Sequence, residues 1–166
     1  MTEEEILAFN IKLKDKKLTI VCAESITAGL LASSIASVSG ASSILKGSVV
    51  TYDRELKSGI LKVNPATIDL YSAESMETTV EMAYGLIKVY PSADLYVAVT
   101  GIASPGTIDY PITGEVGDVY IVIYYKREES AKRLNQFKIQ IKKPKRNDIR
   151  EEAVREILKK IIAIIE

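Results

Sequence analysis

Short apolar segments alternate along the chain with longer segments that carry one apolar stripe. The short segments, rich in β-branched and aromatic residues, predict strands at residues 18–23, 48–52, 94–100, 117–125 and 134–141. Alternation of strands and helices in the first half favours parallel strands joined by crossover helices, and the two consecutive strands near the end favour an antiparallel edge. The pattern therefore predicts an α/β fold: a three-layer α/β/α sandwich on a mixed sheet of about five strands.

The amphipathic segments predict helices with recognisable start signals. Thr2 and Glu5 have the spacing of a capping box, and Asp148 with Glu151 repeats it before the last helix. Ser72 is the expected cap of the longest helix, and Pro65 suits the first turn of another. The expected helices cover residues 2–15, 27–39, 53–61, a short segment from 65, 73–90 with the stripe Met76, Val80, Ala83, Ile87 and Tyr90, and 149–165.

Composition and charge narrow the classes of partner. The 166 residues predict one domain, 1–166, and 22 basic side chains balance 22 acidic ones, so no nucleic-acid partner is expected. The basic run at 142–146 is interpreted as a solvated loop. No apolar stretch is long enough for a membrane span and the start is acidic, so we expect a cytoplasmic protein without a membrane partner. Surplus apolar residues in the last helix favour a homodimer: Ile161, Ile162, Ile164 and Ile165.

The sequence has no histidine and a single cysteine, which limits the chemistry available. Ser-His-Asp and Cys-His catalysis are excluded, and the commonest zinc ligand is missing, so no metal site is expected. Cys22 lies inside a predicted strand and is expected to be a core residue. A nucleophile in this protein needs another base.

Ser25 stands where the first strand turns into a helix. This position lies at the carboxyl edge of a sheet, where open α/β folds bind ligands, and free N–H groups at a helix start favour an oxyanion. Ser25 is therefore a candidate nucleophile. The alternative is that Ser25 or Thr27 only caps the helix.

Tyr52 and Lys57 follow the next strand and can reach the same edge. A neutral lysine can act as the base for a serine when desolvation lowers its pKa, and a tyrosine hydroxyl can relay the proton or hold the lysine. The alternative is that Tyr52 packs and Lys57 is a surface lysine. The small-residue loop at 100–106 is either an ordinary turn or a phosphate-binding backbone.

Nearly the whole chain resembles the C-terminal domain of the competence/damage-inducible protein CinA. The resemblance rests on motifs that occur in the family's order. They are Ala23-Glu24-Ser25 with Thr27 and Gly29, Gly47-x-Val49-Val50-Thr51-Tyr52, Lys57, Met82-Ala83-x-Gly85, Ala98-Val99-Thr100-Gly101-Ile102-Ala103-x-Pro105, and Gly117-x-Val119-Tyr120.

The resemblance implies an enzyme, because this family includes nicotinamide mononucleotide deamidases, which release ammonia and form nicotinate mononucleotide. It assigns catalysis to Ser25, Tyr52 and Lys57 and needs no cofactor, the partner being a small nucleotide substrate. The phosphate or ribose would be held by Thr27, Gly29, Thr100, Gly101, Ile102, Ala103 and Ser104.

The chain departs from the family pattern around the expected pocket. Ala28 and Ser104 stand where the family usually has glycine, and an added side chain opposes close backbone approach to a ligand. Two alternatives therefore remain open: a module that binds a pyridine nucleotide without hydrolysing it, and a hydrolase of the same chemistry acting on another amide.

Overall fold

A single five-stranded sheet forms the centre of the computed structural model, which describes residues 2–129 and 133–166. The strands lie in the order β2-β1-β3-β4-β5. β1 runs parallel to β2 and β3, whereas β4 is antiparallel to both β3 and β5. Their bounds are β1 Ile20–Glu24, β2 Leu45–Val50, β3 Leu95–Gly101, β4 Asp118–Tyr125 and β5 Leu134–Gln140. The predicted mixed sheet with an antiparallel edge is confirmed.

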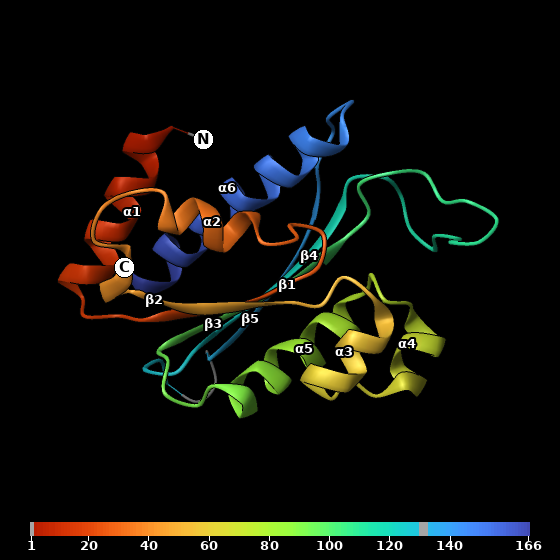
Figure 1. Cartoon of the computed structure of the whole chain (residues 1–166), viewed down its shortest axis with the longest axis horizontal. Coiled ribbons are helices and arrows are strands. Elements are labelled where there is room, and N and C mark those ends of the chain that lie inside the picture. The colour runs from red at the N-terminus through yellow and green to blue at the C-terminus, as the bar shows by residue number, and fades with distance from the viewer. Residues whose placement is uncertain (1, 130–132) are drawn as a thin grey trace.

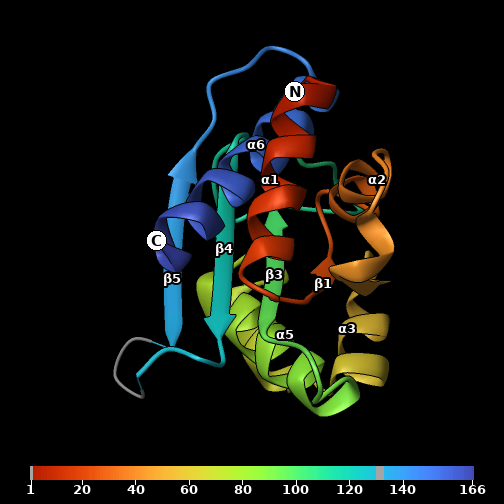
Figure 2. The same cartoon turned by 90° about the vertical axis from the view of Figure 1, so that its left-hand side faces the viewer.

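Helices cover both faces of this sheet, which confirms the three-layer prediction (Figure 1). One face carries α1 (Glu3–Asp15), α2 (Leu30–Ala36) and α6 (Arg146–Ile165). The other face carries α3 (Arg54–Leu61), α4 (Pro65–Tyr71) and α5 (Met76–Val89). Figure 2 shows α1 and α6 crossing in front of the strands.

Each central strand feeds two cores because successive side chains point to opposite faces. In β1, Ile20 and Cys22 pack under α1, α2 and α6, while Val21 and Ala23 pack under α5. Cys22 is fully buried, as predicted, and burial raises the pKa of its thiol well above the ordinary value. No helix in the described part of the chain is both long and apolar enough to cross a bilayer.

Three predicted helix starts are wrong, each for a local reason. The helix expected at Thr27 begins at Leu30, because Ala28 (φ 48°) and Gly29 (φ 91°) adopt left-handed conformations. Ser72 ends α4, and Ser75 caps α5 instead. The last helix begins at Arg146 with Lys145 as its N-cap, so Asp148 lies inside it. The capping box of Thr2 and Glu5 is confirmed.

The apolar stripes of the last two long helices are rotated relative to the predictions. The buried face of α5 is centred on Met82, Ala83 and Leu86, and Tyr90 lies exposed at the end. The surplus isoleucines of α6 are not exposed: two are buried, and the others pack partly buried against the same core. This removes the feature on which the homodimer was predicted, and the homodimer stays a prediction.

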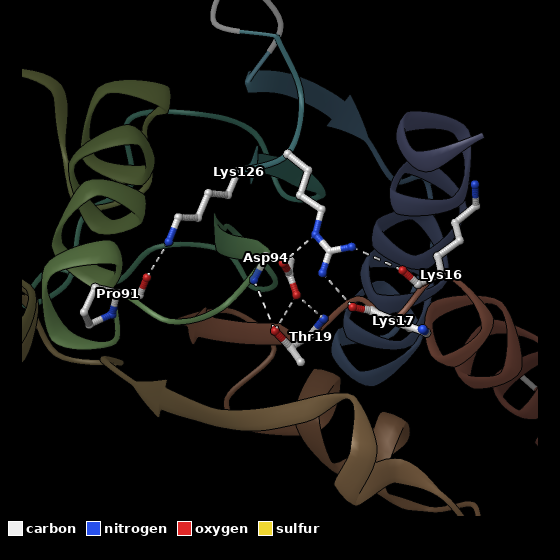
Figure 3. Close-up of polar contacts among 7 residues, drawn as sticks. Lys16, Lys17, Thr19, Pro91, Asp94 and Lys126 are labelled. Carbon is white, nitrogen blue, oxygen red and sulfur yellow. Dashed lines mark hydrogen bonds and ion pairs between the residues drawn. The ribbon is translucent and has the colours of Figure 1, made fainter.

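A polar cluster joins strand ends at the edge of the sheet opposite Ser25. The Asp94 carboxylate, just before β3, accepts hydrogen bonds from the Thr19 backbone and hydroxyl groups, both at 2.8 Å, just before β1 (Figure 3). Arg127 donates to Asp94 at 2.8 Å and to the Lys17 carbonyl at 2.8 Å. These contacts hold together the amino ends of the parallel strands β1 and β3. Ser25 lies beyond the carboxyl end of β1, at the opposite edge of the sheet.

The buried carboxylate of Glu24 fixes the turn that follows β1. It accepts hydrogen bonds from the backbone N–H groups of Gly29 (2.9 Å), Leu31 (3.0 Å) and Ala32 (3.0 Å), and from the hydroxyl of Ser48 on β2 (2.9 Å). A carboxylate at a helix N-terminus satisfies orphan donors and interacts favourably with the helix dipole. Glu24 therefore has the capping role that the alternative interpretation gave to Ser25 or Thr27.

Replacing Glu24 by glutamine should destabilise the fold strongly, since the amide group cannot accept the bonds that one carboxylate oxygen now receives. We expect a loss of roughly 3 kcal/mol in the free energy of unfolding, measured by urea denaturation. Ser48→Ala, which removes one donor, should cost about 1 kcal/mol. A Glu24→Gln variant as stable as Ser48→Ala would contradict this role.

Gly85 lets α5 pass directly beneath the end of α3. A Cβ atom at this position would lie 1.9 Å from the Leu61 carbonyl oxygen, whereas one at Gly59 would meet nothing within 4 Å. This contact fixes the position of α3, the helix that carries Lys57, relative to α5.

Gly85→Ala should therefore lower the free energy of unfolding by about 1–3 kcal/mol through overpacking. Gly59→Ala, in the exposed interior of α3, should raise it by about 0.5–1 kcal/mol through the lower backbone entropy of the unfolded chain. Urea titration of both variants tests the pair, and equal effects would refute the close approach.

Candidate active site

Ser25 lies in a tight turn immediately after β1. Its N–H donates to the Val99 carbonyl on β3 at 3.1 Å, and its own carbonyl accepts from Ala28 at 3.0 Å. These bonds fix the backbone on both sides of the side chain, which is only 5% exposed. The turn therefore holds the hydroxyl in one place at the carboxyl edge of the sheet.

Lys57 projects from the first turns of α3 onto Ser25. Asp53 caps this helix by accepting from the Glu55 N–H at 2.7 Å. The Lys57 Nζ atom lies 3.0 Å from Ser25 Oγ, 2.8 Å from the Thr51 carbonyl oxygen and 3.3 Å from the Tyr52 carbonyl oxygen. The structure thus brings together Ser25 and Lys57, and Lys57 is not the surface lysine of the alternative interpretation.

The three acceptors around the amine match the three N–H groups of its protonated form, and they also accommodate the neutral form. A neutral lysine amine has two hydrogens and one lone pair. If the two carbonyl groups take both hydrogens, the lone pair remains for the proton of Ser25. Lys57 is 0% exposed, and this burial lowers its pKa to about 8, against the opposing charges of Glu74 and Asp53. Desolvation therefore favours the neutral form of this amine more than in a solvent-exposed lysine.

One threonine lies just beyond β2 and another at the end of β3, the two strands that neighbour β1. Thr51 and Thr100 follow Val50 and Val99, the strand partners of Glu24. Thr79 of α5 donates to the Ser75 carbonyl at 2.6 Å, so the 2.8 Å contact between Thr79 and Thr100 takes its hydrogen from Thr100. This buried chain fastens α5 to the end of β3 next to the nucleophile.

Tyr52 contributes its backbone rather than its hydroxyl group to the lysine. It lies just beyond β2, its side chain is 54% exposed, and its hydroxyl accepts a hydrogen bond from Arg146 of α6. Arg146 also donates to the Ser104 hydroxyl at 2.6 Å. The structure therefore joins two predicted residues, Tyr52 and Ser104, through an arginine that the sequence interpretation assigned to a solvated loop.

Most of the predicted residues at the end of β3 and in the loop after it are buried or packed against other parts of the fold. Gly101 packs so closely that a Cβ atom would lie 2.6 Å from the Asp118 carbonyl oxygen. The Ile102 N–H donates to the same carbonyl at 2.9 Å, and Ile102 and Ala103 are buried. Ser104 is the predicted residue of this loop whose side chain reaches another segment of the site, through Arg146.

The backbone N–H groups near Ser25 divide into two sets. Those of Ala28, Gly29 and Leu30 donate to Ser25, Glu24 and Thr27, so they are not available to a ligand. Those of Ile26 and Thr27 have no acceptor within residues 2–129 and 133–166. The Thr27 hydroxyl is buried and also lacks a partner there.

Arg150 of α6 binds the backbone of the turn that carries Ser25. Its guanidinium donates to the Ile26 carbonyl at 3.1 Å and to the Thr27 carbonyl at 2.8 Å. No group of three or more acidic, cysteine or histidine side chains in the described ranges is arranged to hold a metal ion.

Known proteins are similar to this chain in sequence and in fold. The CinA C-terminal domain family matches residues 4–165. A protein of Mycoplasma pneumoniae named Protein MG115 homolog is 34% identical over 93% of this chain and 92% of its own length. A CinA-like protein of Petrotoga mobilis is 46% identical over 61% of this chain, which corresponds to 25% of that protein. The chain spans a third or less of several such curated relatives.

A solved structure matches the whole fold. The competence/damage inducible protein CihA from Agrobacterium tumefaciens superposes with a TM-score of 0.85 at 28% identity, covering 99% of this chain and 95% of that one. The match of the family over nearly the full length agrees with the Mycoplasma relative and with this superposition. The chain belongs to the CinA C-terminal domain family.

Proposed function

We propose that this chain is an amidohydrolase that converts nicotinamide mononucleotide to nicotinate mononucleotide and ammonia. One observation carries the proposal: the buried Lys57 amine lies 3.0 Å from the Ser25 hydroxyl, with backbone carbonyl groups as its other partners. A serine with an adjacent neutral base is the arrangement that nucleophilic catalysis requires. The family resemblance supplies the substrate.

In the first half of the reaction, Ser25 Oγ attacks the carboxamide carbon while Lys57 Nζ takes the hydroxyl proton. The carbonyl oxygen becomes an oxyanion, for which the unpaired N–H groups of Ile26 and Thr27 are the nearest backbone donors in sequence. Collapse of this intermediate breaks the C–N bond. Lys57 returns its proton to the leaving nitrogen, which departs as ammonia.

In the second half, Lys57 is again neutral and activates a water molecule. Hydroxide adds to the ester carbon, the bond to Ser25 Oγ breaks, and Lys57 protonates the serine. The product is the nucleotide carboxylate. Tyr52 keeps the amine in place through its backbone carbonyl, and its exposed hydroxyl, with Arg146 and Ser104, offers hydrogen bonds to the phosphoribosyl part of the substrate.

The non-catalytic alternative has one structural argument in its favour. Ala28 holds a left-handed conformation (φ 48°) that alanine adopts at an energetic cost, immediately beside the turn that carries Ser25. A binding module would bind the nucleotide without releasing ammonia. A hydrolase of another amide would release ammonia only from that amide.

Ammonia release decides between these functions. The wild type should release ammonia from nicotinamide mononucleotide, and Ser25→Ala should lose at least a thousandfold in kcat, because no other group can form the ester. Ser33→Ala, an exposed serine on α2, is the matched control and should behave as the wild type. Binding without release by the wild type would favour the binding module.

The pH dependence of kcat/KM reports the base. Lys57 accepts a proton only when neutral, and burial lowers its pKa to about 8, so the rate should rise about tenfold per pH unit below that value and level off above it. Lys57→Arg, which stays protonated, should be inactive throughout. A profile that is flat from about pH 6 to 9 would rule out Lys57 as the base.

A further inference from the structure

The segment between β3 and β4 extends beyond the body of the fold, at the same edge of the sheet as Ser25 (Figure 1). Residues 105–111 are all exposed. Ile108 is 100% exposed and Tyr110 79%, the two largest exposed fractions among the large apolar side chains of the described residues. Apolar surface in water is stabilised when a partner covers it. These two side chains are therefore the first candidates for a contact that the free protein does not make.

Hydrogen bonds within the segment give its tip a fixed shape. The Thr107 N–H donates to the Tyr110 carbonyl at 3.0 Å, and the Tyr110 N–H donates to Thr107 Oγ1 at 3.1 Å. A Cβ atom at Gly106 would lie 2.9 Å from the Ile112 nitrogen and 3.1 Å from the Tyr110 carbonyl oxygen, so the chain is closely packed here. The tip is therefore a compact unit that presents Ile108 to solvent.

Both ends of this segment are anchored, whereas the tip is not. Before it, the Ile102 N–H donates to the Asp118 carbonyl at 2.9 Å, and after it the Glu115 N–H donates to the Asp118 carboxylate at 3.2 Å. Within residues 2–129 and 133–166, no group of residues 105–113 forms a hydrogen bond or ion pair with a residue outside the segment. Exposed segments with few contacts open at a low free-energy cost. The tip can therefore move as one unit between its two anchors.

The start of the segment also lies at the candidate site. One guanidinium nitrogen of Arg146 donates to Ser104 Oγ at 2.6 Å, and another donates to the Tyr52 hydroxyl. The Tyr52 carbonyl oxygen in turn lies 3.3 Å from the Lys57 amine. An extended chain spans at most about 3.6 Å per residue, so the backbone of Ile108 stays within roughly 14 Å of Ser104. The tip is therefore within reach of the exposed side of the site.

We propose that residues 105–113 form a lid that closes over the bound substrate and brings Ile108 and Tyr110 into contact with it. The proposal rests on the proposed function, in which the pyridinium ring and ribose of nicotinamide mononucleotide occupy the site beside Ser25 and Lys57. The flat ring offers the apolar surface that the tip lacks in the free protein, so the closed lid favours planar aromatic amides. Closure also removes water from the site, which strengthens the electrostatic interactions inside it.

The absence of tryptophan from the sequence makes closure directly measurable. Tyr110→Trp in the inactive Ser25→Ala chain introduces a single fluorescent reporter at the tip. Nicotinamide mononucleotide should shift its emission to shorter wavelength and lower its quenching by acrylamide about twofold, because the closed lid shields the indole from water. Tyr84→Trp in the same chain, at a 46% exposed position on α5, is the matched control and should show neither change.

A kinetic readout separates closure from a structural role. Ile108→Ser should raise KM for nicotinamide mononucleotide about tenfold and leave kcat within about twofold, because the lost contact stabilises the bound substrate and not the reacting groups. The same substitution should leave the urea midpoint of unfolding unchanged, since Ile108 is fully exposed in the free protein. Leu70→Ser, at a 73% exposed position on α4, is the matched control and should change neither KM nor the midpoint.

Three outcomes would overturn the lid. If the wild type releases ammonia from nicotinamide mononucleotide and the emission of the Tyr110→Trp reporter stays unchanged at saturating nucleotide, the lid is wrong and the proposed function stands. An emission shift that follows protein concentration without the nucleotide would assign the tip to a second copy of the chain. Absence of both calorimetric binding to the Ser25→Ala chain and ammonia release by the wild type would overturn the lid and the proposed function together.

Discussion

The buried amine of Lys57 is the constraint on which the site depends. No carboxylate lies within ion-pair distance of it in the described chain, and two backbone carbonyl groups and the Ser25 hydroxyl replace its water. Three oxygen acceptors can satisfy an ammonium ion as well as a neutral amine, and it is burial that lowers the pKa of Lys57 to about 8. This set of partners depends on the relative positions of β2 and α3. The Asp53 cap fixes the start of α3, and the contact of Gly85 with Leu61 fixes its end.

Strand alternation keeps the other buried charge away from this amine. Glu24 and Ser25 are neighbours, so their side chains leave β1 on opposite faces of the sheet. The Glu24 carboxylate binds the start of α2, while Ser25 meets Lys57 beneath α3. An ion-paired carboxylate would raise the pKa of Lys57 further than the charges of Glu74 and Asp53 already do. The fold therefore uses the two faces of one strand for structure and for chemistry.

Local patterns in the sequence were sufficient to predict the strands and their layers, whereas the pairing of Ser25 with Lys57 was predicted from the family resemblance and stayed open from spacing alone. The strands and their layers follow from hydrophobic periodicity. The start of α2 was missed because its cap comes from Glu24 in the preceding strand and not from a residue at the helix boundary. Arg146 was missed because its position depends on contacts with Tyr52 and Ser104, which lie far from it in the sequence.

The first turns of α6 contact two parts of the candidate site: the exposed side chains near Tyr52 and the backbone turn that carries Ser25. Arg146 binds the exposed side chains of Tyr52 and Ser104, whereas Arg150, one turn further along the same helix, holds the carbonyl groups of Ile26 and Thr27. Those carbonyl groups belong to the turn that carries Ser25 and the unpaired N–H groups. One helix therefore contacts both the exposed side chains of Tyr52 and Ser104 and the backbone turn that holds the Ser25 hydroxyl.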